Sequence, residues 1–317
     1  MAQSLFKVLK ARQPERAIDV LAPQWSLPVV TRMPEVRSAV LSRTGHGRID
    51  LATRRQIAAS LRGCYDRAIV IPRSFKAALV PWLARVPVRT GFRGESRFFL
   101  INDVRPFDRQ ILDQTVKRIV ALGLDAGESL PGELPSPSLR ISVDNQARVI
   151  DALGLHLERP VIALMPGAEY GPAKRWSVEK FAELAARLNA AGYAIWILGS
   201  QKDAAAGGRI ADGSEAVNLC GRTSLEDVID LLAVCEQAVT NDSGLMHIAS
   251  AVGIRVNVIY GSSSSKVTPP LTKKSEIHEI DLDCKPCFAR ECPLGHSRCL
   301  ADISVESVFA KIVEKVR

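Results

Sequence analysis

The order of apolar and polar residues along the chain predicts helices and strands in alternation. Residues 4–12 carry apolar side chains at helical spacing, and the small and apolar residues at 17–23 are typical of a buried strand. Two further strands are predicted at 67–72 and 89–92. A loop rich in Arg, Gly and Ser follows each of these two strands, and loops at strand ends are where α/β sheets bind ligands.

A more regular alternation begins at residue 161. Strands are predicted at 161–165, 193–198, 237–240 and 256–260, and helices at 178–188, 224–235 and 243–252. Ser177 is a suitable N-cap for the first of these helices, and Gly192 is a suitable stop. Strands that alternate with helices at this spacing are typical of a parallel, doubly wound α/β sheet.

Prolines mark the division of the chain. Its 317 residues favour two domains, and residues 130–138 contain three prolines without any periodicity, which predicts a linker. We therefore expect an N-terminal domain at 1–155 and a C-terminal domain at 156–317. No stretch approaches the roughly 20 apolar residues that cross a bilayer, and the first residues lack a signal-peptide core. We expect a cytoplasmic location.

Positive charge is concentrated in the first half of the chain. The net charge is +8, and residues 1–155 hold 24 Lys and Arg against 14 Asp and Glu, whereas the remainder holds 18 against 20. This asymmetry is weak evidence for a polyanionic partner, such as nucleic acid, an anionic membrane or a phosphorylated substrate. A solvated basic surface without such a partner is the alternative. Arginine, which suits bidentate phosphate contacts, is frequent here, at Arg54, Arg55, Arg62, Arg67, Arg73, Arg85, Arg89, Arg93 and Arg97.

The segment Thr240–His247 (TNDSGLMH) lies where a predicted strand meets a predicted helix. Ser243 and Gly244 open that helix, and amides at a helix start have no intrahelical partner, so they suit a phosphate or diphosphate. Asp242 can cap the helix or accept a hydroxyl group, and His247 follows one turn later. An ordinary helix cap is the alternative. A serine-hydrolase site is disfavoured because the G-x-S-x-G elbow is missing.

A second loop, residues 166–176 (PGAEYGPAKRW), joins a predicted buried strand to an amphipathic helix. Gly167 and Gly171 allow the backbone to approach a ligand closely. Lys174 and Arg175 can supply positive charge to a leaving diphosphate. The alternative is a flexible connection with two solvated cations. The sequence contains neither G-x-G-x-x-G nor a Walker A segment, so dinucleotide and P-loop chemistry are not indicated.

Together these two segments resemble those of the lipopolysaccharide heptosyltransferases, most closely the heptosyltransferase II branch. Further blocks similar to the family lie at 33–36, 74–80, 89–95, 102–105 and 260–263, so the resemblance covers nearly the whole chain. It implies α/β architecture with two Rossmann-like domains facing across a cleft, the glycosyltransferase B fold. It also implies inverting transfer of heptose from ADP-L-glycero-D-manno-heptose to the first heptose of the inner core, without a metal or other cofactor.

The resemblance also assigns roles to individual residues. Lys174 would contact the donor diphosphate and stabilise the leaving group, with Arg175 beside it. Phosphate and sugar would be held by Asp242, Ser243, Gly244 and His247, and Gly199 and Thr223 would lie near the nucleoside. The acceptor would be a Kdo-lipid A glycolipid, reached by peripheral contact with the inner face of the inner membrane. Candidates for contact with the acceptor are Arg73, Lys76, Arg93 and Arg97.

The start of the sequence departs from the family pattern. Residues 1–6 align inside the first helix of the family, so the first strand and its Gly-Asp turn, whose aspartate is the family's proposed base, have no counterpart here. A start codon assigned too far downstream, a truncation or a degenerate copy would each explain this. A sheet without that strand should expose apolar neighbours. No other carboxylate is suited to be the base: Asp19 lies in a predicted buried strand, and Asp66, Glu95 and Asp103 are only remote alternatives.

Four of the seven cysteines, Cys284, Cys287, Cys292 and Cys299, are clustered, and His296 lies between them. The cluster resembles an extension found in some heptosyltransferase II sequences. Three interpretations remain open: reduced structural thiols, a redox or disulfide role, or a structural zinc site in which His296 could replace Cys299.

Other functions remain as alternatives to transfer onto the first heptose. Heptosyltransferase I or III activity differs only in the acceptor. A non-catalytic copy would retain the nucleotide-sugar pocket without the base. An RNA-binding role is disfavoured because no RNA-recognition motif or set of stacking aromatic residues accompanies the arginines, so we expect no nucleic-acid partner.

Overall fold

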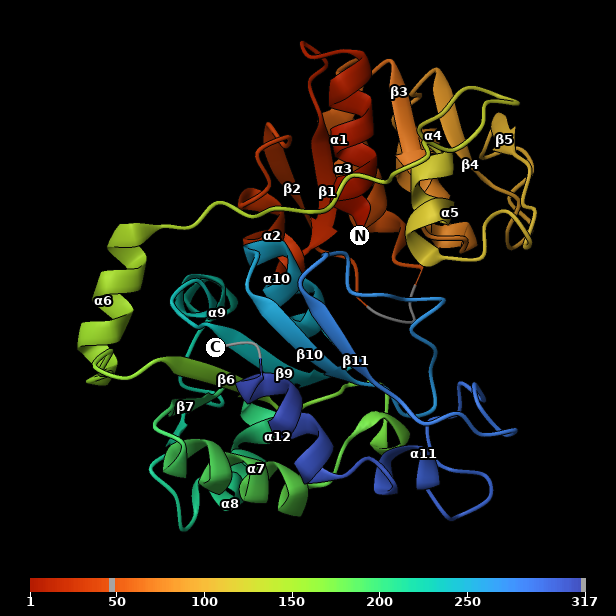
Figure 1. Ribbon diagram of the computed structural model, residues 1–317. Coiled ribbons are helices and arrows are strands. Elements are labelled where there is room, and N and C mark those ends of the chain that lie inside the picture. The colour runs from red at the N-terminus through yellow and green to blue at the C-terminus, as the bar shows by residue number, and fades with distance from the viewer. Residues whose placement is uncertain (46–48, 315–317) are drawn as a thin grey trace. The chain divides into compact units, whose positions relative to one another are not determined.

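The computed structural model describes residues 1–45 and 49–314. The chain forms two compact units, Met1–Ser136 and Pro137–Arg317 (Figure 1). Each unit is built from helices and parallel strands, as the alternating pattern predicts.

The N-terminal unit opens on the predicted helix. Its elements are α1 (Ala2–Arg12), β1 (Asp19–Pro23), η1 (Gln24–Ser26), α2 (Leu27–Thr31), β2 (Ser38–Ser42), α3 (Leu51–Leu61), β3 (Arg67–Val70), η2 (Phe75–Ala78), α4 (Leu79–Leu83), β4 (Val88–Phe92), β5 (Asp103–Arg105) and α5 (Thr115–Ala121).

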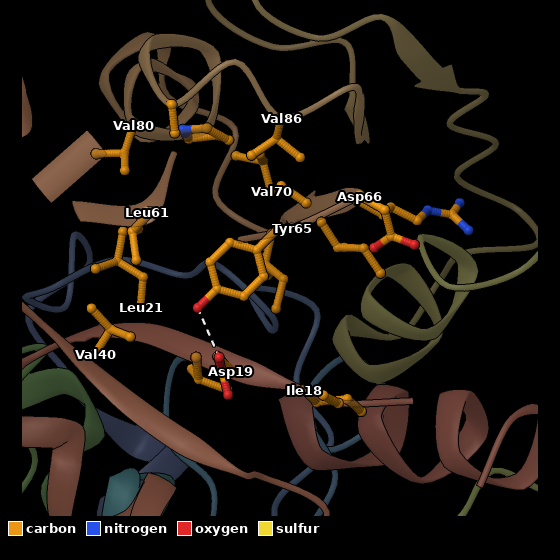
Figure 2. A pocket seen from close by; sticks show the side chains of 18 of the residues that line it. Ile18, Asp19, Leu21, Val40, Leu61, Tyr65, Asp66, Val70, Val80 and Val86 are labelled. Atoms are coloured by element: carbon orange, nitrogen blue, oxygen red, sulfur yellow. Dashed lines mark hydrogen bonds between the residues drawn. The ribbon is translucent and has the colours of Figure 1, made fainter. Parts of the chain in front are cut away.

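The strands of this unit form two separate parallel sheets instead of one. The first sheet is β1–β2, and the second has the order β3–β4–β5. The prediction that 17–23 is a buried strand is only partly right, because Leu21 of β1 is 38% exposed. A cavity of about 310 Å³ lies between the two sheets, with β1 on one side and β3 on the other (Figure 2).

The C-terminal unit contains one continuous sheet. Its elements are α6 (Val143–Leu153), β6 (Val161–Met165), η3 (Pro172–Lys174), α7 (Val178–Ala190), β7 (Ala194–Ile197), η4 (Gln201–Asp203), α8 (Ala204–Ala211), β8 (Val217–Asn218), α9 (Leu225–Leu232), β9 (Gln237–Asn241), α10 (Gly244–Val252), β10 (Arg255–Ile259), β11 (Ser275–His278), α11 (Arg298–Ala301) and α12 (Val305–Val313). The strand order is β11-β10-β9-β6-β7-β8, and every pair is parallel.

Helices cover both faces of this sheet, and the core lies beneath them. Figure 1 shows α7, α8 and α12 on one face and α9 and α10 on the other. Trp176 and Phe181 pack edge to face in a buried cluster with apolar residues of β6, β7 and α12. Burial on both faces explains why β6 is a continuous apolar run and why its ends are predicted correctly.

The division between the units lies earlier than the predicted boundary at 155. Helix α6 belongs to the C-terminal unit because it is bonded to α9: the Asn145 side chain donates to Asp227 and Asp230, and Arg148 forms an ion pair with Asp227. The backbone N–H of Leu139 also donates to the carbonyl of a residue in α10. The proline-rich linker is therefore the boundary itself.

Candidate functional site

The path of the chain through the C-terminal sheet creates a topological switch point between β6 and β9. From β6 the chain continues to β7 and β8 on one side, and it then returns to β9, β10 and β11 on the other side. In parallel sheets the carboxyl ends of the strands at such a point form the usual ligand crevice. The segments that follow β6, β9 and β10 at this edge are residues 166–176, 242–243 and 260–263.

Lys174, Asp242 and Ser263, one from each loop, form a polar cluster. The Nζ of Lys174 donates to Oδ2 of Asp242, and the Ser263 Oγ donates to the same oxygen over 2.6 Å. The Asp242 side chain is 5% exposed and that of Lys174 is 17% exposed. The buried Asp242 carboxylate therefore fixes the position of the Lys174 ammonium group. An ammonium group has three N–H donors, so Lys174 can also donate to a ligand.

Asn241 fastens both ends of the loop that carries Lys174. Its fully buried Nδ2 donates to the carbonyl of Pro166 over 2.7 Å, and its Oδ1 accepts the backbone N–H of Trp176 over 3.0 Å. The indole N–H of Trp176 in turn donates to the carbonyl of Ile303. These contacts hold loop 166–176 to the end of β9.

The cysteine-rich segment supports the same loop from the other side. The N–H of Ala173 donates to the carbonyl of Arg290, and the N–H of Ser262 donates to the carbonyl of Ala173, both over 3.0 Å. A Cβ at Gly171 would lie 2.5 Å from the Arg290 carbonyl oxygen, and one at Gly261 would lie 2.3 Å from that of Ala173. Glycine is required at both positions because the backbones approach so closely.

The start of α10 is open. Ser243 is the N-cap, yet its side chain makes no capping bond within the described part of the chain. Its Oγ lies 3.4 Å from that of Thr240. Gly244 is exposed, and no described atom beyond its immediate neighbours lies within 4 Å of the place a Cβ would occupy. The first amides of α10 are therefore accessible to an anion, and His247 lies one turn further along the helix.

Gly199 and Thr223 follow β7 and β8, at the same carboxyl edge of the sheet. The carboxylate of Asp203 is packed against Gly199 and Gly167, where added Cβ atoms would approach Asp203 to 2.9 and 2.8 Å. Asp203 also accepts the N–H and the hydroxyl of Ser200. Thus Asp203 packs against the chain just after both β6 and β7.

A model of "Glycosyltransferase family 9 (heptosyltransferase)" matches residues 54–298. The chain belongs to glycosyltransferase family 9. The lipopolysaccharide heptosyltransferase 2 of Salmonella typhimurium is 42% identical over 98% of this chain and 93% of the relative. The solved E. coli ADP-heptose lipopolysaccharide heptosyltransferase II is 39% identical and superimposes with a TM-score of 0.88, over 99% of this chain and 93% of that one.

A family 9 glycosyltransferase from Veillonella parvula shares the fold at 18% identity, with a TM-score of 0.83 over 98% of this chain and 92% of that chain. These matches confirm the expected glycosyltransferase B fold and the family resemblance, and they identify the protein as a glycosyltransferase enzyme.

The arginines expected to contact the acceptor divide into two kinds in this glycosyltransferase. Arg73 and Arg93, which follow β3 and β4, are exposed, and Lys76 is half-buried. Arg97 is 2% exposed, and its guanidinium donates to the carbonyls of Pro72 and Phe92 over 2.6 Å each. Burial lowers the pKa of Arg97. Arg97 therefore ties the β3 and β4 loops together and is not available for the expected acceptor contact.

Asp19 and two of the three remote alternatives for the base, Asp103 and Glu95, already have partners. The Arg37 guanidinium holds the pKa of Asp19 below its usual range. Asp103 accepts the hydroxyl of Thr90 over 2.7 Å, and Glu95 accepts a backbone N–H over 3.0 Å. These bonds give the three side chains structural roles.

The four clustered cysteines are free thiols that line a small cavity together with His296. The Ser297 N–H donates to the Cys292 sulfur and lowers the pKa of that thiol, whereas burial raises the pKa of Cys299. Among the described residues no three His, Cys, Asp or Glu side chains are grouped as a metal site. The zinc interpretation therefore gains no support. The segment braces loop 166–176, and Lys285 within it also forms an ion pair with Glu279.

Among residues 1–45 and 49–314, no helix is long and apolar enough to cross a membrane. No role was predicted from the sequence for Asn241, Ser263 or Asp203. The only local signal was the Ser200–Asp203 spacing of a capping box, because the other two act through partners distant in sequence.

Proposed function

We propose that this enzyme transfers heptose from ADP-L-glycero-D-manno-heptose to the first heptose of the lipopolysaccharide inner core. The observation that carries the proposal is the uncapped start of α10, on the same sheet edge as the fixed ammonium group of Lys174. The names of the relatives at 39 and 42% identity support heptosyltransferase II activity over the I and III alternatives.

The charges at this edge suit the departure of ADP. During transfer the acceptor hydroxyl oxygen bonds to C1 of the heptose, and the bond from C1 to the diphosphate oxygen breaks, which inverts the configuration. Lys174 and the positive end of α10 stabilise the charge that develops on the diphosphate. Arg175, whose Nε donates to the Ala168 carbonyl, adds charge at the rim. Because these groups stabilise the charge that develops on the diphosphate, we propose that the reaction needs neither a metal ion nor another cofactor.

The other residues of the edge position the donor. Asp242 and Ser263 orient Lys174, while Ser243, Gly244 and His247 bind phosphate and sugar. Gly199 and Thr223 flank the nucleoside. The acceptor hydroxyl passes its proton to a base as the new bond forms.

The acceptor is a Kdo-lipid A glycolipid, bound through Arg73, Lys76 and Arg93 of the N-terminal unit. The Arg93 guanidinium lies 4.8 Å above the ring of Phe98, and Phe98 and Phe99 are both more than 60% exposed. Arginine beside exposed aromatic rings suits an anionic membrane surface. We propose a cytoplasmic enzyme in peripheral contact with the inner membrane.

Titration calorimetry of the full chain with ADP-heptose, ADP and UDP tests the donor site. We expect ADP-heptose and ADP to bind and UDP to bind at least tenfold more weakly. Lys174→Ala should weaken ADP binding about tenfold or more, as expected for loss of a charge-assisted contact of about 1.5 to 3 kcal/mol. The matched control is Arg209→Ala, because that exposed arginine pairs only with exposed Glu179 among the described contacts.

Equal affinity for ADP and UDP, or unchanged binding in Lys174→Ala, would contradict the proposed donor site. Binding of ADP-heptose without any heptosyl transfer would contradict the proposed reaction.

A further inference from the structure

The cysteine-rich segment, residues 284–299, brings an arginine of its own to the edge of the sheet where Lys174 lies. This residue, Arg290, has no role in the donor contacts described above. Its guanidinium lies 5.4 Å from the centroid of the Tyr170 ring, and the ammonium group of Lys174 lies 5.2 Å from the same centroid. Two cations from segments far apart in the sequence therefore share one aromatic ring in the loop that follows β6.

Hydrogen bonds fix the part of the segment from which Arg290 projects. The carbonyl of Arg290 accepts the N–H of Ala173 over 3.0 Å. The N–H of Phe288 donates to the carbonyl of Ser262 over 2.8 Å, and the Ser262 hydroxyl donates to the carbonyl of Ala289 over 2.9 Å. This stretch is thus bonded to the two loops that follow β6 and β10. None of these bonds uses the side chain of Arg290.

The Tyr170 ring is also fixed, because its hydroxyl donates to the carbonyl of Phe288 over 2.6 Å. A guanidinium over the face of an aromatic ring is attracted to it, and a side chain held in this way loses less freedom when it binds a ligand. Tyr170 is 41% exposed and Arg290 is exposed, so both remain accessible to a ligand.

The positive charge of Arg290 is not neutralised by a carboxylate. Within residues 1–45 and 49–314 its guanidinium forms no ion pair. The carboxylate of Glu169 is instead bonded to Lys202 over 2.7 Å. The pKa of Glu169 lies below its usual range mainly because Lys202 donates to it, and to a smaller extent because of nearby arginines, which include Arg290. The guanidinium of Arg290 therefore remains available to an anion.

We propose that Arg290 binds the diphosphate of ADP-heptose together with Lys174 and stabilises the departing ADP. This inference rests on the proposed donor site. A diphosphate has two phosphate groups, so each cation can contact one of them, and a planar guanidinium suits two oxygens of the same phosphate. When the bond to C1 breaks, its electron pair remains on the diphosphate oxygen. Arg290 stabilises that charge without gaining or losing a proton.

Titration calorimetry with ADP, AMP and adenosine tests the proposal on the full chain and on the variants Arg290→Met, Arg290→Lys and Lys174→Ala. Methionine keeps an apolar side chain over the Tyr170 ring and removes the charge. Arg298→Met is the matched control, because Arg298 is an exposed arginine of the same segment and its Nε donates to Asp302 over 2.9 Å. The thermal midpoint is measured for each protein.

We expect Arg290→Met to weaken ADP binding about tenfold, as for the loss of a charge-assisted hydrogen bond. AMP, which has one phosphate, should lose less affinity, and adenosine should bind equally well to both proteins. Arg290→Lys should restore part of the ADP affinity, because it restores the charge without the planar fork. The thermal midpoint should be nearly unchanged, because the bonds that hold the segment do not involve this side chain.

Unchanged ADP affinity in Arg290→Met, together with weaker binding in Lys174→Ala, would overturn the role of Arg290 and leave the proposed donor site intact. Adenosine binding that weakens as much as ADP binding would also overturn it, because the substitution would then disturb the whole pocket. An equal loss of ADP affinity in Arg298→Met would contradict a specific contact. Failure of the unaltered chain to bind ADP would overturn both this inference and the donor site.

Discussion

At the scale of single residues, the groups that carry charge could be predicted from the sequence, whereas the groups that hold them could not. Lys174 and Asp242 stand out because each lies in a loop at the end of a predicted strand. Ser263, which fixes Asp242, is 21 residues further along the chain. Asn241 bonds to residues 65 and 75 positions away. Such pairings depend on strand order, which local spacing does not reveal.

Asn241→Ala should lower both stability and donor affinity. The change leaves the Pro166 carbonyl and the Trp176 N–H without partners, which costs about 2 to 4 kcal/mol of unfolding free energy. Loop 166–176 then loses its attachment at both ends, so ADP should bind at least fivefold more weakly. Urea unfolding and calorimetry measure the two effects. Asn257→Ala is the control, because that buried amide bonds to Gln237 and lies away from the loop.

Comparable stability loss in both variants, with ADP affinity reduced only in Asn241→Ala, is the expected outcome. An equal effect of the two changes on affinity would show that Asn241 has no particular role in positioning the loop.

Arg93→Ala should change the KM for the acceptor, whereas Arg97→Met should change the stability of the N-terminal unit. Arg93 is exposed, so its loss should raise the KM for the acceptor severalfold, less so at high salt, with little effect on stability. Arg97 is buried and bonded to three carbonyls, so its loss should destabilise the unit by about 3 kcal/mol. Steady-state kinetics with varied acceptor and thermal unfolding distinguish the two; an acceptor KM that is insensitive to Arg93→Ala would remove it from the acceptor site.

At the scale of elements, the accuracy of prediction follows burial. The central strands β6, β9 and β10 are buried at all or nearly all of their positions, and their predicted ends agree with the structure to within a residue. Strands β5 and β8 were not predicted because they are too short to show an alternation of apolar and polar residues. Strands β2 and β11 were also not predicted. Helix α6 was placed in the wrong domain because its amphipathic pattern does not say which helix it packs on.

Glycine substitutions separate the opening of α10 from the packing beside it. Gly244→Val should leave the thermal midpoint nearly unchanged, because there is space for the side chain, but it should weaken ADP binding at least tenfold by covering the free amides. Gly261→Ala should lower the midpoint by several degrees, because its Cβ would lie 2.3 Å from the Ala173 carbonyl. Unimpaired ADP binding by Gly244→Val would exclude the helix start as the anion site.

At the scale of the whole molecule, the sequence predicted the family and the two-unit architecture from blocks spread along the chain. It could not predict that the N-terminal strands would form two parallel sheets on either side of a cavity. That outcome depends on side chains such as Tyr65 and Asp19, which bond across the two sheets.

The C-terminal sheet should lose stability in mild acid. His278 is buried, with its Nε2 3.3 Å from the Asn257 side chain, and burial lowers its pKa to about 4 from 6.5. Between these values the unfolded chain gains a proton that the folded chain does not, so stability falls as the pH drops from about 6.5 towards 4, by roughly 3 kcal/mol at most.

Urea unfolding at pH 7 and pH 5 measures this difference. His278→Gln should reduce the loss between the two pH values, whereas His156→Gln, at an exposed position, should not. The same pH dependence in all three proteins would show that His278 is not its source.

The most direct test of the central claim is mass-spectrometric detection of heptosyl transfer from ADP-heptose to mono-heptosylated Kdo-lipid A. The protein is assayed with this acceptor and with Kdo-lipid A that lacks heptose. We expect heptose to be added to the mono-heptosylated acceptor only. No transfer, or transfer only to the acceptor without heptose, would contradict the proposed function.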